Sequence, residues 1–222
     1  MSEVDTLRPD EAAASFPEIR VPLSWTYEIQ VNVLAKLPTG AGLEIHEQMR
    51  SRQSKHPNFT LEYEEPSARI ASTNFRHSDP TAVYTFSVEE RELVFHRHEG
   101  ARVILGFTGD RGAALVFSTM SLAEERQSPQ YFPESVRTVE IEPNSLFVLK
   151  FDGRVAHTFR PLRPGVGPAS SALSIHPDEE RGLTGELRET VRSDRSSIPA
   201  LTNPISTSAA TAYSQRKEVG ER

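Results

Sequence analysis

The sequence predicts one mainly β domain, a sandwich or barrel built from short strands. From Phe59 onward, short runs rich in β-branched and aromatic residues recur, separated by turn signals such as Ser78-Asp79-Pro80 and Glu142-Pro143-Asn144. Strands of this length and spacing are typical of all-β folds. No alternation of strands with helices and no glycine-rich phosphate loop appears, which argues against a nucleotide-binding α/β fold. The expected strands cover residues 59–63, 69–72, 82–87, 92–96, 102–107, 113–118, 136–141, 146–151 and 171–175.

The first part of the chain adds a lead-in, a strand and a helix. Residues 1–20 are acidic and contain alanine and proline, so we expect a flexible lead-in. Residues 25–33 alternate between apolar and polar side chains, as a half-buried strand does. After the break at Pro38-Thr39-Gly40, residues 43–53 favour a helix with a basic last turn. We expect this helix to cover one side of a sheet.

The later part of the chain is expected to hold a hairpin, a short helix and a loose tail. Residues 104–117 favour a hairpin across Gly109-Asp110, and residues 184–191 favour a helix. Residues 196–222 are rich in Ser, Thr, Ala and Pro, which predicts disorder or loose docking. The predicted organisation is a lead-in over residues 1–20, a β domain with one or two flanking helices over 21–180, and a partly disordered tail over 181–222.

Composition excludes several classes of protein. A chain of 222 residues with 36% hydrophobic content can bury one sizeable core. The formal net charge of −6, without a basic cluster, argues against nucleic-acid binding. No apolar run approaches the ~20 residues of a membrane span. The chain has no cysteine, and therefore no disulfide or thiolate metal site. The acidic N-terminus does not resemble a leader peptide, so we expect a cytoplasmic protein.

Three histidines carry the functional prediction. His96 and His98 end one apolar run, and His157 follows another run and an Asp152-Gly153 turn. Residues i and i+2 of a strand point to the same face, so His96 and His98 aim into one space. A third imidazole from a later strand could complete a facial set of nitrogen ligands for iron, copper, nickel or zinc, with positions open for substrate or dioxygen. The alternative is that they are solvated histidines that bind nothing.

These motifs resemble those of cupins and of the related non-haem iron oxygenases. Cupins carry His-x-His in a first motif and Pro-x-Gly followed by His in a second. Here His96-Arg97-His98 with Gly106 resembles the first motif, and Pro143, Gly153 and His157 resemble the second. The resemblance covers residues 83–177. It implies a double-stranded β-helix, which is a jelly-roll barrel, with a mononuclear metal held by the three histidines.

The chain departs from these families in its acidic ligand. Cupins usually place a Glu three or four residues after the His pair, whereas Glu99 is adjacent to it and alternation turns it away from the pair. A three-histidine site remains, which resembles cysteine-dioxygenase-like cupins, although Glu99 or Asp152 stays open as a replacement ligand. The His-x-acid motif of the Fe(II)/2-oxoglutarate oxygenases is absent. His98-Glu99-Gly100, read as His-x-Gly, resembles the iron halogenases.

Arginines are the candidate groups for binding an anionic substrate or cosubstrate, because guanidinium groups hold carboxylates bidentately. Arg102 shares the strand parity of the histidine pair, so it would point inward if no bulge intervenes. Arg160 and Arg163 follow His157, somewhat early for the cosubstrate arginine of the 2-oxoglutarate oxygenases. A surface position is the alternative for each. His176 ends the last strand, and we expect it at the surface.

The sequence therefore predicts an oxygenase that uses one divalent metal, Fe(II) by resemblance, on a small-molecule substrate and dioxygen. An Fe(II)/2-oxoglutarate-dependent hydroxylase or halogenase-like enzyme is the nearer alternative. The other alternative is a non-catalytic module that binds a small ligand or a partner. Neither nucleic acid nor membrane is expected as a partner, and a homodimer is left open.

Overall fold

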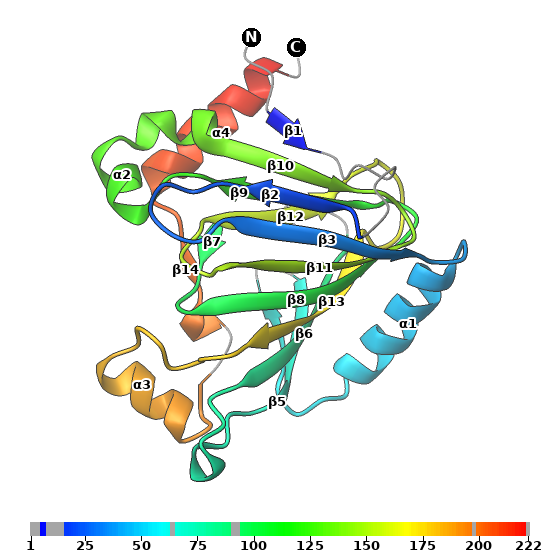
Figure 1. The fold of residues 1–222 in the computed structure, drawn as a ribbon. Helices are drawn as coiled ribbons and strands as arrows, with labels where there is room; N and C mark the ends of the chain where they lie inside the picture. Colours follow the sequence, from blue (N-terminus) through cyan, green and yellow to red (C-terminus); the bar gives the residue numbers. More distant parts are fainter. Residues whose placement is uncertain (1–4, 8–15, 63–64, 90–93, 197–198, 221–222) are drawn as a thin grey trace.

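Two β-sheets form the body of the protein in the computed structural model, which describes residues 5–7, 16–62, 65–89, 94–196 and 199–220 (Figure 1). The first sheet has the order β1 (Asp5–Leu7), β10 (Val136–Ile141), β9 (Ala113–Ser118), β12 (His157–Pro161), β7 (His96–Arg97) and β14 (Asn203–Pro204). The second has the order β2 (Glu18–Val21), β3 (Ile29–Lys36), β11 (Ser145–Asp152), β8 (Ala101–Thr108), β13 (Ser170–His176), β6 (Ala82–Val88), β5 (Glu65–Ala71) and β4 (Phe59–Glu62). Among the described strands, only β1 and β10 pair in parallel.

The path of the chain from β6 to β13 defines the fold. β6, β8, β11 and β13 lie in the second sheet, whereas β7, β9, β10 and β12 lie in the first. The chain thus passes repeatedly from one sheet to the other, and the four strands of each set are neighbours in the orders β11-β8-β13-β6 and β10-β9-β12-β7. This strand order is that of a double-stranded β-helix, or jelly roll. The predicted fold class is confirmed.

One predicted connection is wrong. β8 and β9 do not form a hairpin, because β8 pairs with β11 and β13 whereas β9 pairs with β10 and β12. The turn at residues 109–112 instead carries the chain from the second sheet to the first. Gly112 has a φ of +65°, which favours glycine in a hairpin turn and in a turn between two sheets alike. Only tertiary packing decides whether the two strands pair with each other or face each other.

The predicted element boundaries agree with the structure in part. β9 and β10 cover the predicted residues, and α1 (Ala41–Gln53) matches the predicted helix closely. Other boundaries differ. β2 lies partly in the segment expected to be flexible, and its Ile19 and Val21 are buried against the core. β12 was not among the predicted strands. Residues 92 and 93 of the predicted strand 92–96 lie outside the described residues, and β7 begins at His96.

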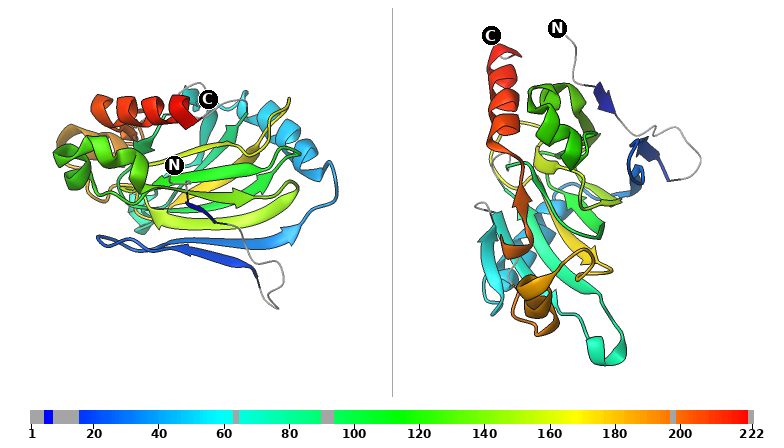
Figure 2. Two further views of the ribbon diagram at one scale, coloured as in Figure 1. Left: turned by 90° about the horizontal axis from the view of Figure 1, so that it is seen from above. Right: turned by 90° about the vertical axis from the view of Figure 1, so that its left-hand side faces the viewer.

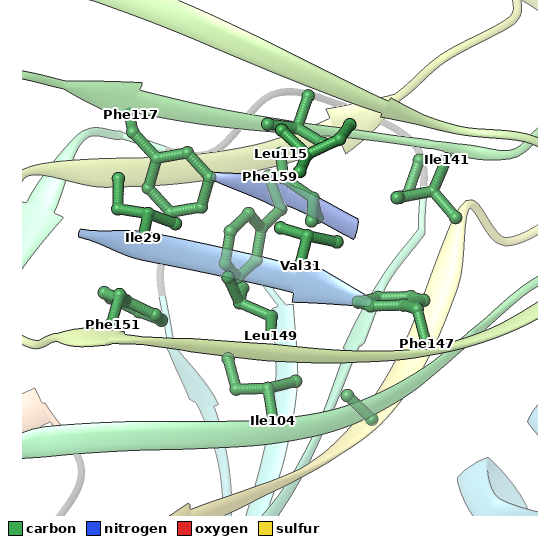
Figure 3. Packing of buried hydrophobic residues seen from close by; sticks show 14 of the residues in the cluster. Ile29, Val31, Ile104, Leu115, Phe117, Ile141, Phe147, Leu149, Phe151 and Phe159 are labelled. Carbon is green, nitrogen blue, oxygen red and sulfur yellow. The ribbon is translucent and has the colours of Figure 1, made fainter. Parts of the chain in front are cut away.

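The core fills the space between the two sheets (Figure 3). Phe117 and Leu115 of the first sheet face Phe147 and Leu149 of the second, and all four side chains are at most 2% exposed. Alternate residues of β3, β8 and β11 point inward, as the period of a strand requires. Ile29, Val31, Ile104, Ile141, Phe151 and Phe159 complete the cluster that Figure 3 labels.

Helices cover the outer faces and one edge. α1 lies on the second sheet, where the Nδ1 atom of the buried His46 is 2.6 Å from the Ser171 hydroxyl. α2 (Leu122–Gln127) follows β9, and α3 (Gly185–Arg192) matches the predicted short helix. The 3₁₀ turns are η1 (Phe75–His77), η2 (Pro129–Ser135) and η3 (Pro199–Leu201). Among the described helices, none has the length and apolar character needed to cross a bilayer.

The last segment of the chain is folded against the domain rather than loosely docked. α4 (Thr207–Gly220) packs on η2, next to α2 (Figure 2). Ala209 is fully buried, and the Tyr213 ring meets the Phe95 ring edge-on at 5.0 Å. The segment has few apolar residues, but they converge on a second small cluster with Phe132 and Val136. Composition alone missed this because it does not record where those residues point.

Candidate metal centre

β7 and β12 bring the three predicted histidines together. His157 is the cross-strand partner of His96, and His98 follows β7 directly. The ring centroids are 4.4 Å apart for His96 and His157, 4.9 Å for His96 and His98, and 5.4 Å for His98 and His157. One nitrogen from each ring lies within 4.8 Å of the others. Three imidazoles at this spacing can bind one metal ion from one side.

Backbone carbonyls anchor all three rings. The Nδ1 atoms of His96 and His157 lie 2.9 Å from the carbonyl oxygens of Val94 and Val155. The Nδ1 atom of His98 lies 3.2 Å from the carbonyl oxygen of Leu201. A carbonyl only accepts hydrogen bonds, so each Nδ1 carries the proton and each Nε2 keeps its lone pair. Such outer contacts orient histidine ligands in metalloproteins.

The same histidines are held neutral by their surroundings. Burial lowers the pKa of His96 to about 4. Burial, with the nearby charge of Arg102, lowers the pKa of His98 well below its usual value, and burial with the neighbouring His96 does the same for His157. At neutral pH no proton therefore competes with a metal ion for the Nε2 atoms.

A second polar group adjoins the histidines and was missed from the sequence. The His176 ring lies 6.4 Å from the His98 ring, and its Nδ1 donates to Glu179 at 2.7 Å. Tyr84 donates its hydroxyl to the other Glu179 oxygen at 2.5 Å, and the Ser174 hydroxyl lies 2.9 Å from His176 Nε2. His176 is 8% exposed, so its predicted surface position is wrong. The inward alternation of Ser174 and His176 along β13 is the signal that could have found it.

This second group keeps one buried negative charge. Burial alone would raise the pKa of Glu179. Hydrogen bonds from His176 and Tyr84, together with the charge of Arg102, lower this pKa by more than burial raises it. Burial, and then Glu179, raise the pKa of Tyr84. Burial lowers the pKa of His176 to about 4. Glu179 is thus an ionised acceptor for two neutral donors. Tyr84 and Glu179 are 95 residues apart, so no local sequence pattern indicates their contact.

Of the three predicted arginines, the structure brings only Arg102 to the histidines. Arg102 is 4% exposed and lies on the same inward face of β8 as the core residue Ile104. Its charge bears on all three histidines of the cluster. Arg160 has the opposite parity to His157 on β12 and so faces away from the core. Arg163 lies beyond β12 and pairs with Glu142 at 2.6 Å.

The two acids that remained open as ligands lie elsewhere. Asp152 accepts hydrogen bonds from Arg154 and from Thr26 at 2.7 and 2.8 Å. The Glu99 carboxylate lies against Gly182. Within the described ranges, the group of side chains placed to hold a metal consists of histidines alone. The cluster could hold a metal ion, and its donors suit a transition metal better than calcium or magnesium.

Neither a family model nor a curated protein matches the sequence. Solved structures are similar to it at low identity. A cupin 2 domain-containing protein from Halorhodospira halophila is 15% identical over 64% of this chain and 83% of its own, with a TM-score of 0.35. Ectoine synthase from P. lautus is 10% identical over 70% of this chain and 86% of its own, with a TM-score of 0.38. Oxalate decarboxylase from Bacillus subtilis is 18% identical over 58% of this chain and 29% of its own, with a TM-score of 0.40.

Proposed function

We propose that this protein is a metal-dependent oxygenase that acts on a small anionic molecule, with Fe(II) held by His96, His98 and His157. The observation that carries the proposal is the set of three neutral imidazoles whose Nδ1 atoms are anchored and whose ligand nitrogens lie within 4.8 Å of one another. A facial set of three nitrogen ligands leaves coordination positions open. A bound iron ion would supply Lewis acidity and the activation of dioxygen at those positions.

The charge around the site favours an anionic substrate. Within the described residues, the histidine cluster includes no carboxylate, so its ligands would add no negative charge to a divalent ion. The buried guanidinium group of Arg102 lies beside the cluster, and Glu179 supplies a buried negative charge nearby. A metal ion and a guanidinium group that lie side by side can both bind one anion. Arg102 would orient the carboxylate or phosphate of a substrate through its planar guanidinium group.

Other residues of the chain would control water and protons. The rings of Phe151 and Phe159 lie 4.7 and 5.6 Å from the His157 ring and shield it on the core side. Exclusion of water strengthens the electrostatic contacts of a bound substrate. The Tyr84 hydroxyl and the His176 Nδ1–H group both donate hydrogen bonds to the ionised Glu179. This network would keep the charge of Glu179 fixed while the substrate binds.

Metal analysis of the untagged protein tests the proposal. The wild-type chain should bind about one equivalent of Fe(II), and His96→Ala, His98→Ala and His157→Ala should each weaken binding by ~10-fold or more while the circular dichroism spectrum is kept. His46→Ala is the matched control, because His46 is as buried as His96 but lies on α1. Full metal retention by the His98 variant would refute the three-histidine site. A folded wild-type protein that binds no metal would favour the non-catalytic ligand-binding alternative.

Use of 2-oxoglutarate is the second candidate, and the position of Arg102 beside the histidines is the observation that favours it. The positions of Arg160 and Arg163 away from the site instead favour an oxygenase that does not use this cosubstrate. For such an enzyme, anaerobic addition of 2-oxoglutarate to the Fe(II) protein should give no visible charge-transfer band. A band that Arg102→Met abolishes and Arg102→Lys weakens would assign the cosubstrate to this enzyme. Oxygen consumption with small carboxylates then tests the oxygenase reaction itself.

A further inference from the structure

The three anchored histidines differ in where their anchors come from. His96 and His157 are each held by the carbonyl two residues before them, so their own strands fix their rings. His98 is held by the carbonyl of Leu201, 103 residues later in the chain. The Thr202 hydroxyl lies 3.4 Å from the same Nδ1 atom. The orientation of His98 therefore depends on the position of the segment over residues 199–216, which we call the C-terminal strap.

The strap also supports the strand that carries the histidine pair. β14 pairs with β7, so that Pro204 lies opposite His96 and Asn203 opposite Arg97. Just before β7, the Phe95 carbonyl accepts a hydrogen bond of 3.0 Å from the Ile205 amide. β7 has two residues and would otherwise lie at the edge of its sheet. A two-residue edge strand has few bonds of its own to hold it in register.

One buried carboxylate links the strap to the residue between the two histidines. Arg97 and Glu125 form an ion pair of 2.5 Å, and both side chains are at most 6% exposed. The other Glu125 oxygen accepts a hydrogen bond of 2.8 Å from the Ser206 amide. Arg97 also donates to the Arg154 carbonyl at 3.0 Å, close to the strand of His157. The position of the strap is thereby tied to Arg97, the residue directly before His98.

The part of the strap that belongs to α4 is docked through a small apolar contact. Ala209 is fully buried, whereas Ser208 beside it is exposed. The Tyr213 ring contacts Phe95 at 5.0 Å and Phe132 at 6.4 Å, in each case edge to face. Phe95 directly precedes His96, so docking of α4 and the start of β7 share one contact. A single charge at Ala209 should release this contact.

We propose that the C-terminal strap is a component of the metal centre, and that it positions His98 as a ligand. The metal role of His98 rests on the proposed function, but its ring orientation can be measured without a metal. With the strap docked, His98 keeps its proton on Nδ1 and presents Nε2 to His96 and His157. With the strap released, His98 loses its anchor while the other two rings keep theirs. Metal binding and strap docking then strengthen each other, because coupling between two binding equilibria is reciprocal.

Nitrogen-detected NMR of the metal-free full-length protein, labelled with ¹⁵N-histidine, tests the anchor. In the wild-type protein the three site histidines should all show the Nδ1–H tautomer. In Ala209→Glu the signals of His98 alone should shift to a mixture of tautomers, and the affinity for Co²⁺ should fall by ~10-fold or more. Ser208→Glu adds the same charge at the neighbouring exposed position and should leave the tautomers and the affinity unchanged.

A milder pair of variants covers the case in which Ala209→Glu unfolds the protein. Tyr213→Ala removes the contacts with Phe95 and Phe132, and Tyr131→Ala removes an exposed ring as its control. A change confined to His98 in Tyr213→Ala supports the proposal. Equal changes at all three histidines, or no change at His98, would overturn it. If the selective tautomer change occurs but the wild-type protein binds no metal, the positioning role stands and the proposed function fails.

Discussion

Acidification should destabilise the metal-free protein, and the histidine cluster sets the pH range. Burial lowers the pKa of His96 to about 4, and the pKa of His176 likewise to about 4. The usual pKa of an exposed histidine in an unfolded chain is ~6.5. Between these values the unfolded chain binds a proton that the folded chain does not. The free energy of unfolding therefore falls as the pH falls through this range, and above pH ~6.5 neither group affects it.

The size of the effect follows from the pKa shifts. Each group lowers the free energy of unfolding by ~1.4 kcal/mol per pH unit, or ~2 kcal/mol between pH ~6.5 and pH ~5. His96 and His176 together thus contribute ~4 kcal/mol over that interval, and His98 and His157 add to it because their pKa values are lowered in the same direction. Domains are stable by ~5–15 kcal/mol, so this loss is a large fraction of the total.

Urea unfolding of the metal-free protein at several pH values measures this slope. His96→Asn should flatten the pH dependence by ~2 kcal/mol over the same interval, because it removes one buried titrating group. His77→Asn, at an exposed position, is the control for loss of a histidine. Identical slopes in the wild-type and His96 proteins would show that His96 is not held neutral in the folded state. Metal at a concentration that saturates the wild-type protein should stabilise it more than it stabilises the His96 variant.

Three further predictions concern elements around the site. A chain ending at Arg195 should unfold at lower urea concentration and lose metal affinity, since it lacks the strap; unchanged values would contradict the packing of Ala209 and Tyr213. Gly153→Ala should weaken metal binding by ~10-fold or more, because the new Cβ would lie 2.6 Å from the Gly100 carbonyl oxygen. An unchanged metal affinity would show that this turn can move without disturbing the histidines. Ser121→Ala should cost ~1 kcal/mol in urea unfolding through loss of the capping box with Glu124, with the exposed Ser54→Ala as a comparison.

The fold and the histidine cluster were predictable because both depend on local periodicity. Strand alternation placed His96 and His98 on one face, and the run before His157 marked a strand of the same barrel. The same parity offered an inward position for Arg102 beside the alternative of a surface position, and the structure buries it next to the histidines. The capping box at Ser121 and Glu124 was a local signal for α2 that the prediction did not use.

The remaining features depend on contacts between distant residues. Nothing near His98 indicates that Leu201 will anchor it, and nothing near Tyr84 indicates that Glu179 will accept its hydrogen bond. The tail was expected to be loose because it has few apolar residues. Ala209 and Tyr213 nevertheless join a cluster with Phe95 and Phe132, which lie far from them in the sequence. Composition does not record such long-range contacts.

The spacing of the histidine motifs has a physical cause in two glycines. Gly100 has a φ of +74°, which favours glycine, and it ends the chain segment of the histidine pair in a tight turn. Gly153 packs on this turn so closely that its amide donates to the Gly100 carbonyl at 2.7 Å, while its own carbonyl accepts from the His98 amide at 2.8 Å. The turn before His157 is thus bonded directly to the turn after His98. These backbone bonds set the distance between the two motifs, and the side chains of the three histidines converge because the glycines permit that approach.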